Sequence, residues 1–293
     1  MTGWILGVIG GSGLYEIEGL RDRRWTRIDS PFGEPSDELL TGRMPAKDAG
    51  DVRLVFLPRH GRGHRLPPSH INARANIDAL KRAGCTDIIS LSAVGSLRQE
   101  LTPGTFVAVD QFIDRTIARE KSFFGPGLVA HVSMARPVCE RLSALAAQAG
   151  RDAGARVVEG GTYLAMEGPQ FSSLAESNLY RSWGCSVIGM TAMPEAKLSR
   201  EAELPYASIG MVTDYDCWHE DEPDVDVPNA LAVLHANADV ARELVRRLAM
   251  SLPAEREPVA IDTCLDFAIA TAPDARDPAM MAKLDAIAGR ILR

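Results

Sequence analysis

The chain lacks the features that would assign it to several common classes of protein. Its 293 residues carry a formal net charge of -7 at pH 7, so no overall basic field is present to hold a polyanion, and we find no convincing basic patch in its place. We therefore expect no nucleic-acid partner. The five cysteines are odd in number, widely scattered and never spaced as CxxC, which favours reduced, buried thiols over a disulfide framework.

The sequence also lacks a basic leader, a membrane-spanning run and a linker. Its opening residues, MTGWILGVIGGSGLY, contain one short apolar run that breaks into glycines, so we expect neither a signal peptide nor a membrane span, and a cytoplasmic location. No repeat, low-complexity tract or long Gly/Ser stretch divides the chain. This favours a single domain over residues 1–293, with a C-terminal helical extension at about 254–293.

Apolar patterning predicts the fold class. Short β-branched runs bounded by turn residues predict strands at 4–9, 54–57, 88–94, 106–109, 187–190 and 207–212. Helical periodicity predicts helices at 70–82, 138–152, 172–181 and 229–250, and two more in the extension at 264–271 and 278–292. Because strands alternate with helices, we expect an α/β fold with a mostly parallel or mixed sheet covered on both faces.

A glycine loop follows the first predicted strand. Its sequence, GGSG at residues 10–13, lets the main chain approach an anion closely, and Ser12 adds a hydroxyl. The loop fails the dinucleotide fingerprint, because Glu16 stands where the third glycine belongs, and it lacks the Lys-Ser/Thr ending of a P-loop. Taken alone, it is as consistent with a plain tight turn as with phosphate binding.

Two further strand ends carry groups suited to an anion. Arg59 offers a planar fork of donors, and His60 beside it can donate another hydrogen bond or assist proton movement. Ser92 and the N–H of Ala93 follow on the next predicted strand and could close the same pocket. The alternatives are a solvated basic loop and a hydroxyl satisfied within a core strand.

Aromatic and acidic groups follow the later strands. Phe171 lies in a turn before a helix, where it either packs in the core or stacks on a base. Asp214 and Asp216 are two apart, so extended backbone would point both at one ligand, and mutual repulsion would let one keep its proton. An acidic turn, or a metal pair with His219 and Glu220, are the alternatives.

Taken together, these segments resemble the trimeric purine nucleoside phosphorylase superfamily, and within it the 5'-methylthioadenosine phosphorylases. The similarity runs from about residue 5 to 248, in the order GGSGLYE, DSPFGEPSDEL, RHGRGH, INARANIDALK, SAVGSLRQEL, DQFIDRT, EGPQFSSLAES, MTAMPEA and VTDYDCW. The resemblance implies a twisted mixed β-sheet flanked by helices, a homotrimer, and no cofactor, with inorganic phosphate as a co-substrate. Nucleoside and phosphate are the small-molecule partners that it implies.

The resemblance also assigns roles to individual positions. It implies a phosphate site made of Ser12, Arg59, His60, Ser92, Ala93 and Thr191. It implies a nucleoside site in which Phe171 lies against the base, Met190 lies against the ribose, and Asp214 and Asp216 contact the purine. His131 matches a histidine donated by a neighbouring subunit. Val227 and Ala230 match the 5' pocket, where small apolar side chains suit a methylthio group better than a hydroxyl.

The implied reaction is phosphorolysis of 5'-methylthioadenosine to adenine and 5-methylthioribose 1-phosphate. The acid would be a protonated Asp214 that donates to N7 of the leaving base, while Asp216 orients it and accepts from the 6-amino group. A 6-oxopurine nucleoside phosphorylase, a metal-dependent hydrolase and a nucleoside sensor are the alternatives. The chain departs from the family pattern in having Ser at 12 and 92 where Thr is frequent, Gly189 where Asn occurs, and Gln170 where Arg is common.

The acidic pair predicts which purine is preferred. A 6-aminopurine presents a donor at position six and a 6-oxopurine presents an acceptor, so carboxylate oxygens favour the amino base. We expect Asp214→Asn to shift the preference toward inosine-type nucleosides, measured as the ratio of kcat/KM for the two kinds of base. An unchanged ratio would refute this account of base recognition.

Overall fold

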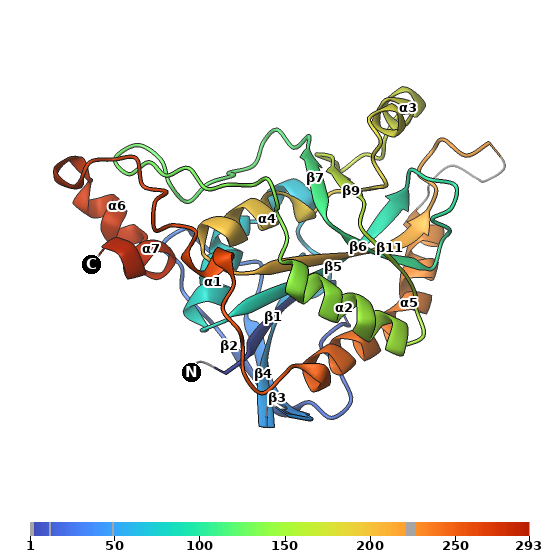
Figure 1. Ribbon diagram of the computed structural model, residues 1–293. Helices are drawn as coiled ribbons and strands as arrows, with labels where there is room; N and C mark the ends of the chain where they lie inside the picture. The colour runs from blue at the N-terminus through green and yellow to red at the C-terminus, as the bar shows by residue number, and fades with distance from the viewer. Residues whose placement is uncertain (1–2, 12, 49, 221–226, 293) are drawn as a thin grey trace.

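One large mixed sheet organises the molecule. The computed structural model describes residues 3–11, 13–48, 50–220 and 227–292, and within them the sheet has eleven strands (Figure 1). These are β1 (Ile5–Gly10), β2 (Arg21–Thr26), β3 (Leu39–Ala46), β4 (Gly50–Pro58), β5 (Asp87–Ser96), β6 (Thr105–Val109), β7 (Gln111–Asp114), β8 (Arg156–Glu159), β9 (Thr162–Ala165), β10 (Val187–Gly189) and β11 (Tyr206–Asp214).

Strand β5 is the centre of this sheet. The main path runs β2-β3-β4-β1-β5-β10-β9-β7, and β11 lies parallel to β5 and antiparallel to β6, which pairs in turn with β8. All six predicted strands are present. Five strands escaped prediction, and β2 shows why: its sequence RDRRWT is largely exposed, so no apolar run marks it.

Helices cover both faces of the sheet. They are α1 (Ala73–Arg82), α2 (Glu140–Asp152), α3 (Leu174–Ser182), α4 (Ala192–Glu201), α5 (Val227–Ser251), α6 (Pro278–Lys283) and α7 (Asp285–Leu292), with 3₁₀ turns η1 (Pro68–His70), η2 (Ala260–Thr263) and η3 (Pro273–Ala275). Alternate residues of β4 enter two different cores: Val55 packs in the core that contains α1 and α4, and Phe56 in the core of α2 and α5 (Figure 1). The expected α/β fold is confirmed.

Two helices that precede or follow site segments have clear start signals. Asn72 caps α1, because its side chain accepts from the N–H of Ala75 at 3.1 Å. Ser173 and Glu176 form a reciprocal capping box at the start of α3. Helix α3 stands away from the body of the molecule in Figure 1, and Leu174 and Leu179 on it are exposed.

The C-terminal extension differs from expectation. The helix predicted at 264–271 is wrong: the chain makes the short 3₁₀ turn η2 and then continues in turns, and Ile269 forms a bridge with Ala130. Pairing with the loop that carries Ala130 satisfies this backbone, so tertiary contact replaces helical hydrogen bonds. The helix predicted at 278–292 is divided in two at Leu284, which is fully buried with Ile287 in the core against α1.

Ion pairs fasten the start of the extension to the sheet. Asp87, at the first position of β5, has no exposed surface and accepts from Arg141 of α2 at 2.6 Å and from Arg256 of the extension. The cysteines are all free thiols, and Cys85, Cys139 and Cys185 are buried. Among the described residues, no helix is long and apolar enough to cross a membrane.

The buried carboxylate of Asp87 predicts a large stability effect. Asp87→Asn removes the carboxylate that Arg141 and Arg256 share and leaves Arg256 with Asp262 alone, and breaking a buried pair in this way costs about 3 kcal/mol. We expect that loss in the free energy of unfolding, measured by urea denaturation. The matched control is Glu140→Gln, whose pair with Arg136 is exposed and should change stability by less than about 0.5 kcal/mol. Equal losses in both variants would contradict the argument.

Candidate active site

The predicted site segments follow strands that end near one another. Strands β1 and β4 run parallel, and β1 and β11 both run parallel to β5, so their carboxyl ends meet at one edge of the sheet. The glycine loop, Arg59 and Asp214 emerge there. Strand β10 runs antiparallel to β5, pairing Ile188 with Gly95, and its antiparallel course carries Thr191 back toward Ser92. These strand pairings gather segments that are far apart in sequence.

Two hydroxyls at this edge are buried without a partner. Neither the Oγ of Ser92 nor the Oγ1 of Thr191 forms a hydrogen bond with any of the described residues. Buried hydroxyls are nearly always satisfied, because an unpaired one costs about 1–3 kcal/mol. The antiparallel course of β10 directs both toward the same edge of the sheet, and hydroxyls of this kind can serve as donors to a small anion. The adjacent Ala93 is exposed at this point of β5.

The guanidinium of Arg59 is buried, and groups of the protein accept most of its hydrogen bonds. Its side chain is 2% exposed, and its Nε and Nη2 donate to Glu195 at 2.5 and 3.2 Å. Nη2 also donates to the Ser90 hydroxyl at 2.6 Å, and Nη1 to the Leu91 carbonyl at 2.9 Å. The expectation of a free planar fork is therefore wrong. Among the described residues, one Nη1 N–H is left for an anion, because Glu195 occupies the two-pronged edge.

His60 is held as a neutral imidazole. Its Nδ1 lies 2.8 Å from the carbonyl oxygen of Leu66, which can only accept, so Nδ1 carries the proton and Nε2 is an acceptor. Burial, with Arg59 and the stacked His64 ring nearby, lowers the pKa of His60 to about 4 despite this hydrogen bond. A neutral Nε2 is suited to accept the P–OH of hydrogen phosphate.

The acidic pair is joined by a turn rather than by extended backbone. Strand β11 ends at Asp214, and Asp216 has a positive φ of 53°, so the expected alternation of side chains does not continue. Instead the N–H of Asp216 donates to Oδ1 of Asp214 at 2.8 Å, and the Thr213 hydroxyl donates to Oδ2 at 2.7 Å. The expected arrangement was wrong, and the proximity of the two carboxyls arises from this local turn.

Both carboxyls favour the protonated form more than a free aspartate does. Burial raises the pKa of Asp214, and the donors from Thr213 and Asp216 only partly oppose it. Burial also raises the pKa of Asp216, with the neighbouring charge of Asp214 adding to the effect and the hydroxyls of Ser177 and Ser172 opposing it. The Oδ2 of Asp216 is buried and makes no hydrogen bond of normal geometry among the described residues, although the Ser177 hydroxyl lies close enough to lower its pKa.

Gly95 makes room for the acidic pair. A Cβ at this position would lie 2.8 Å from Oδ1 of Asp214, 3.1 Å from the Ile188 side chain and 3.4 Å from the Cβ of Asp216. Only glycine allows β5, β10 and the end of β11 to approach this closely. The SAVGS motif thus has a packing role next to the carboxyls.

Met190 contacts the turn that leads to Phe171. A Cβ at Gly168 would lie 2.5 Å from the Met190 sulfur, and Gly168 also has a positive φ of 72°. Both the close contact and the backbone conformation therefore require glycine at this position. Phe171 itself is 44% exposed, so it is not the core residue of the alternative interpretation. An exposed aromatic at the end of this turn offers an open apolar surface for a planar ligand.

Of four further expected site residues, the structure describes the side chain of His131 alone. Ser12 is not among the described residues, and neither are the side chains of Val227 and Ala230 at the start of α5. His131 is exposed in the loop between β7 and α2, where its backbone N–H donates to Ala268 of the extension at 2.9 Å.

Glu195 and Tyr163 were not singled out from the sequence. Glu195 is 3% exposed and accepts from Arg59, from the Ser90 hydroxyl at 3.0 Å and from the Tyr206 hydroxyl at 3.2 Å. The sequence gives one signal, an acidic residue in the otherwise apolar MTAMPEA segment. Tyr163 explains Gly189: a Cβ there would lie 2.0 Å from the Tyr163 hydroxyl, which accepts from the N–H of Thr191 at 3.4 Å.

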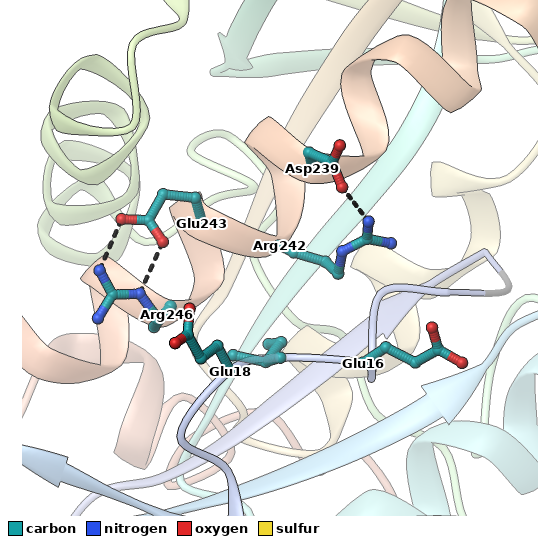
Figure 2. A pocket seen from close by; sticks show the side chains of 7 residues that line it. Glu16, Glu18, Asp239, Arg242, Glu243 and Arg246 are labelled. Atoms are coloured by element: carbon teal, nitrogen blue, oxygen red, sulfur yellow. Dashed lines mark hydrogen bonds and ion pairs between the residues drawn. The ribbon is translucent and has the colours of Figure 1, made fainter.

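One cavity is lined by none of the strand-end residues described above. It measures about 160 Å³ and is lined by Glu16, Ile17, Glu18, Asp239, Arg242, Glu243 and Arg246 (Figure 2). Its arginines are already paired within α5, Arg242 with Asp239 and Arg246 with Glu243. Arg242 also donates to the carbonyl of Gly13 at 3.2 Å, so this cavity lies beside the glycine loop. No group of three or more potential metal ligands occurs among the described residues.

The fold and these strand-end segments define the class of protein. The chain belongs to the phosphorylase superfamily, whose family model matches residues 5–250. The extension beyond residue 250 lies outside this match.

Relatives within that family make the comparison more specific. The S-methyl-5'-thioadenosine phosphorylase of Cereibacter sphaeroides is 60% identical over 291 residues, 99% of each chain. A methylthioadenosine phosphorylase sourced from an Antarctic soil metagenomic library has a similar structure, with a TM-score of 0.90, 42% identity and coverage of 98% of this chain and 99% of that one. The Schistosoma mansoni enzyme, solved with adenine, gives a TM-score of 0.75 at 38% identity over 84% of this chain and 91% of that one. The expected purine nucleoside phosphorylase-like fold is confirmed.

The unpaired hydroxyl of Thr191 predicts a separation of stability from phosphate binding. Thr191→Val should leave the unliganded protein as stable as before or slightly more stable, because it removes a buried group that has no partner. Phosphate should bind about tenfold more weakly or worse, since a hydrogen bond to a charged group contributes about 1.5–3 kcal/mol. Thermal denaturation with increasing phosphate measures both quantities.

The control is Ser199→Ala, which removes another buried, unpaired hydroxyl two turns further along α4. It should leave phosphate-dependent stabilisation unchanged. Equal phosphate affinity in the wild type and Thr191→Val would remove Thr191 from the anion site.

Proposed function

We propose that this chain catalyses the phosphorolysis of 5'-methylthioadenosine, yielding adenine and 5-methylthioribose 1-phosphate. The relatives at up to 60% identity over nearly the whole chain support the substrate class. The observation that carries the proposal is chemical: two buried hydroxyls without partners lie at the same sheet edge as a buried carboxyl pair with raised pKa values. An anion completes the first set, and a purine completes the second.

The phosphate side combines neutral donors with a limited positive charge. Ser92 and Thr191 offer hydroxyls, Arg59 offers one N–H and its nearby charge, and Ser12 and the N–H of Ala93 complete the proposed set. His60 accepts the P–OH through Nε2, which leaves the unprotonated phosphate oxygens free to face the sugar. The Arg59 charge is partly offset by Glu195, so the bound phosphate retains the negative charge needed to stabilise a cationic sugar.

The purine side supplies the acid. Asp214 donates its proton to N7 of the base, and the unpaired Oδ2 of Asp216 accepts from the 6-amino group. Phe171 and Met190 provide the apolar surface against which base and ribose lie. Burial raises the pKa of Asp214 and so favours the protonated form that this donation requires.

Bond cleavage then follows from the electrostatics of the two sides. The C–N glycosidic bond lengthens first, and the positive charge that develops at the anomeric carbon is stabilised by the phosphate dianion. The proton from Asp214 neutralises the leaving adenine, and a phosphate oxygen forms the new C–O bond. Hydrogen phosphate loses its own proton when it becomes the sugar ester, and that proton restores Asp214 through solvent after the products leave.

A homotrimer completes the proposed site. His131 is exposed on its loop and would reach the site of a neighbouring subunit, while Val227 and Ala230 would receive the methylthio group. Exposed Ile117 and Val129 on the same long loop supply apolar surface for such a contact. We propose a cytoplasmic location for the enzyme and methionine and purine salvage as its setting.

The reaction requires phosphate and no metal, which predicts the outcome of one assay. Purified protein incubated with 5'-methylthioadenosine should release adenine when phosphate is present and none when phosphate is omitted, with the products identified by chromatography. EDTA should leave the rate unchanged. Adenine release without phosphate, or its loss on chelation, would favour a hydrolase; tight nucleoside binding with no turnover would favour a sensor. Inosine as the better substrate would favour the 6-oxopurine alternative.

A further inference from the structure

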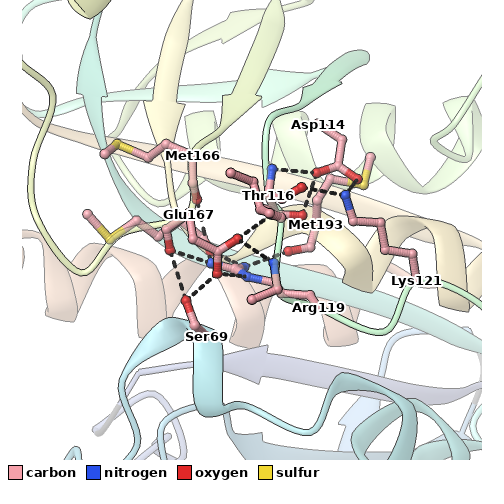
Figure 3. A network of polar contacts seen from close by, with 11 residues as sticks. Ser69, Asp114, Thr116, Arg119, Lys121, Met166, Glu167 and Met193 are labelled. Carbon is pink, nitrogen blue, oxygen red and sulfur yellow. Dashed lines mark hydrogen bonds and ion pairs between the residues drawn. The ribbon is translucent and has the colours of Figure 1, made fainter.

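Arg119 lies in the loop between β7 and α2 and contacts the backbone of two of the proposed substrate segments. Its side chain is only 5% exposed. Nη1 donates to the carbonyl oxygens of Met190 at 2.5 Å and Met193 at 2.8 Å, on either side of Thr191. Nη2 donates to the carbonyl of Glu167 at 2.7 Å, in the turn that leads to α3 (Figure 3). One guanidinium therefore holds the segment after β10 and the turn after β9.

The carboxylate of Glu167 brings in a third segment. Its Oε1 accepts from Nε of Arg119 at 3.2 Å and from the hydroxyl of Ser69, which lies in η1 at the far end of the loop that follows β4 (Figure 3). Its Oε2 accepts from the N–H groups of Ile117 and Ala118, the latter at 3.2 Å. The loop that begins with the proposed phosphate ligands is thus tied to the turn on the nucleoside side.

This network is permanently charged. Burial by itself raises the pKa of Glu167, but the hydrogen bonds from Ser69 and Ile117 and the charge of Arg119 outweigh it and bring the pKa to about 2. The carboxylate is ionised throughout the physiological pH range. A charge-assisted pair of this kind is stronger than neutral hydrogen bonds between the same segments.

Arg119 has no donor left for a substrate. All five of its N–H groups have acceptors, because Nη2 also faces the carbonyl of Met166 at 3.5 Å. Arg119 and Thr191 nevertheless line one small cavity, with Glu195 on another wall. Any influence of Arg119 on the reaction must therefore pass through the carbonyls that it holds. Irregular backbone such as this has no neighbouring strand to satisfy it.

We propose that Arg119 and Glu167 are a positioning pair that fixes the phosphate-side loop ending at Ser69, the segment around Thr191 and the turn before α3 in one arrangement. The pair keeps the phosphate and nucleoside subsites at the separation that the reaction needs. This inference rests on the proposed phosphorolysis and adds two residues that contact neither substrate. Positioning errors of about 1 Å are enough to cost a hundredfold in rate.

Arg119→Lys tests the pair while preserving its charge. A single ammonium cannot serve four carbonyls and a carboxylate, so the two segments lose their common anchor. We expect kcat/KM to fall at least tenfold, with KM rising at least threefold for phosphate and for the nucleoside alike. The wild-type assay with both substrates establishes the proposed reaction first, so failure of that function and failure of the pair are distinguishable.

The matched control is Arg136→Lys, in the same loop, whose side chain is 82% exposed and pairs with Glu140. Its kinetic constants should stay within twofold of the wild type. If Arg119→Lys leaves every constant unchanged, or lowers kcat only in proportion to a smaller folded fraction measured by circular dichroism, the proposal is overturned. An increase confined to one substrate would overturn it as well.

Ser69→Ala provides a second variant if Arg119→Lys does not fold. It removes a single hydroxyl between the phosphate-side loop and Glu167. We expect a threefold or larger increase in KM for phosphate with an unchanged melting temperature. In combination with Glu167→Gln, the loss should be less than the product of the two single losses, because both changes cut the same link. If Ser69→Ala leaves the KM for phosphate unchanged, the proposed link between the phosphate-side loop and Glu167 is wrong.

Discussion

The buried ion pair between Arg59 and Glu195 is the interaction on which the site depends. It joins the end of β4 to the first turn of α4, and the Ser90 and Tyr206 hydroxyls add links to β5 and β11. Removing one partner of such a pair would leave an uncompensated charge in the interior, at a cost of about 3–5 kcal/mol. Because both charges are present and hydrogen-bonded, four elements can meet without water. The proposed phosphate cradle is built directly on this junction.

The polar groups around that junction differ in how many hydrogen-bond partners they have. Arg59 and Glu195 have several partners, whereas Ser92, Thr191 and Oδ2 of Asp216 have none among the described residues. Leaving buried oxygens unpaired is unfavourable for folding, and the proposed function accounts for the three at this sheet edge by assigning phosphate and purine as their partners. The same edge holds carboxyls whose pKa values are raised by burial, which is the pattern of a site tuned for proton transfer. The groups that suit the proposed chemistry at this edge therefore lower the stability of the unliganded protein.

A second Arg–Glu pair extends this logic to the loops. Arg119 and Glu167 satisfy carbonyl and amide groups of segments that have no regular secondary structure, much as the first pair secures the ends of strands and a helix. The C-terminal extension acts on the same long loop from the other side, since its backbone pairs with Val129 and His131. The loop that carries His131 is therefore fixed at both ends by parts of its own chain. His131 itself stays exposed on this loop.

The alternation of strands and helices could be predicted from the sequence, since apolar runs of strand length and helical periodicity are local signals, and the motifs were enough to indicate the family. Ser92, Thr191 and the Asp214–Asp216 pair could also be chosen as candidates, because each stands directly after or within such a strand. Three features came from tertiary contacts: the fork of Arg59 faces Glu195, Asp216 turns back onto Asp214, and Ile269 pairs with a loop where a helix was expected. The physical reason is that each of these features depends on a partner far away in the chain or on a backbone turn. A buried charge or carbonyl forms its hydrogen bonds with the groups that the folded sheet places next to it, and local sequence does not specify those groups.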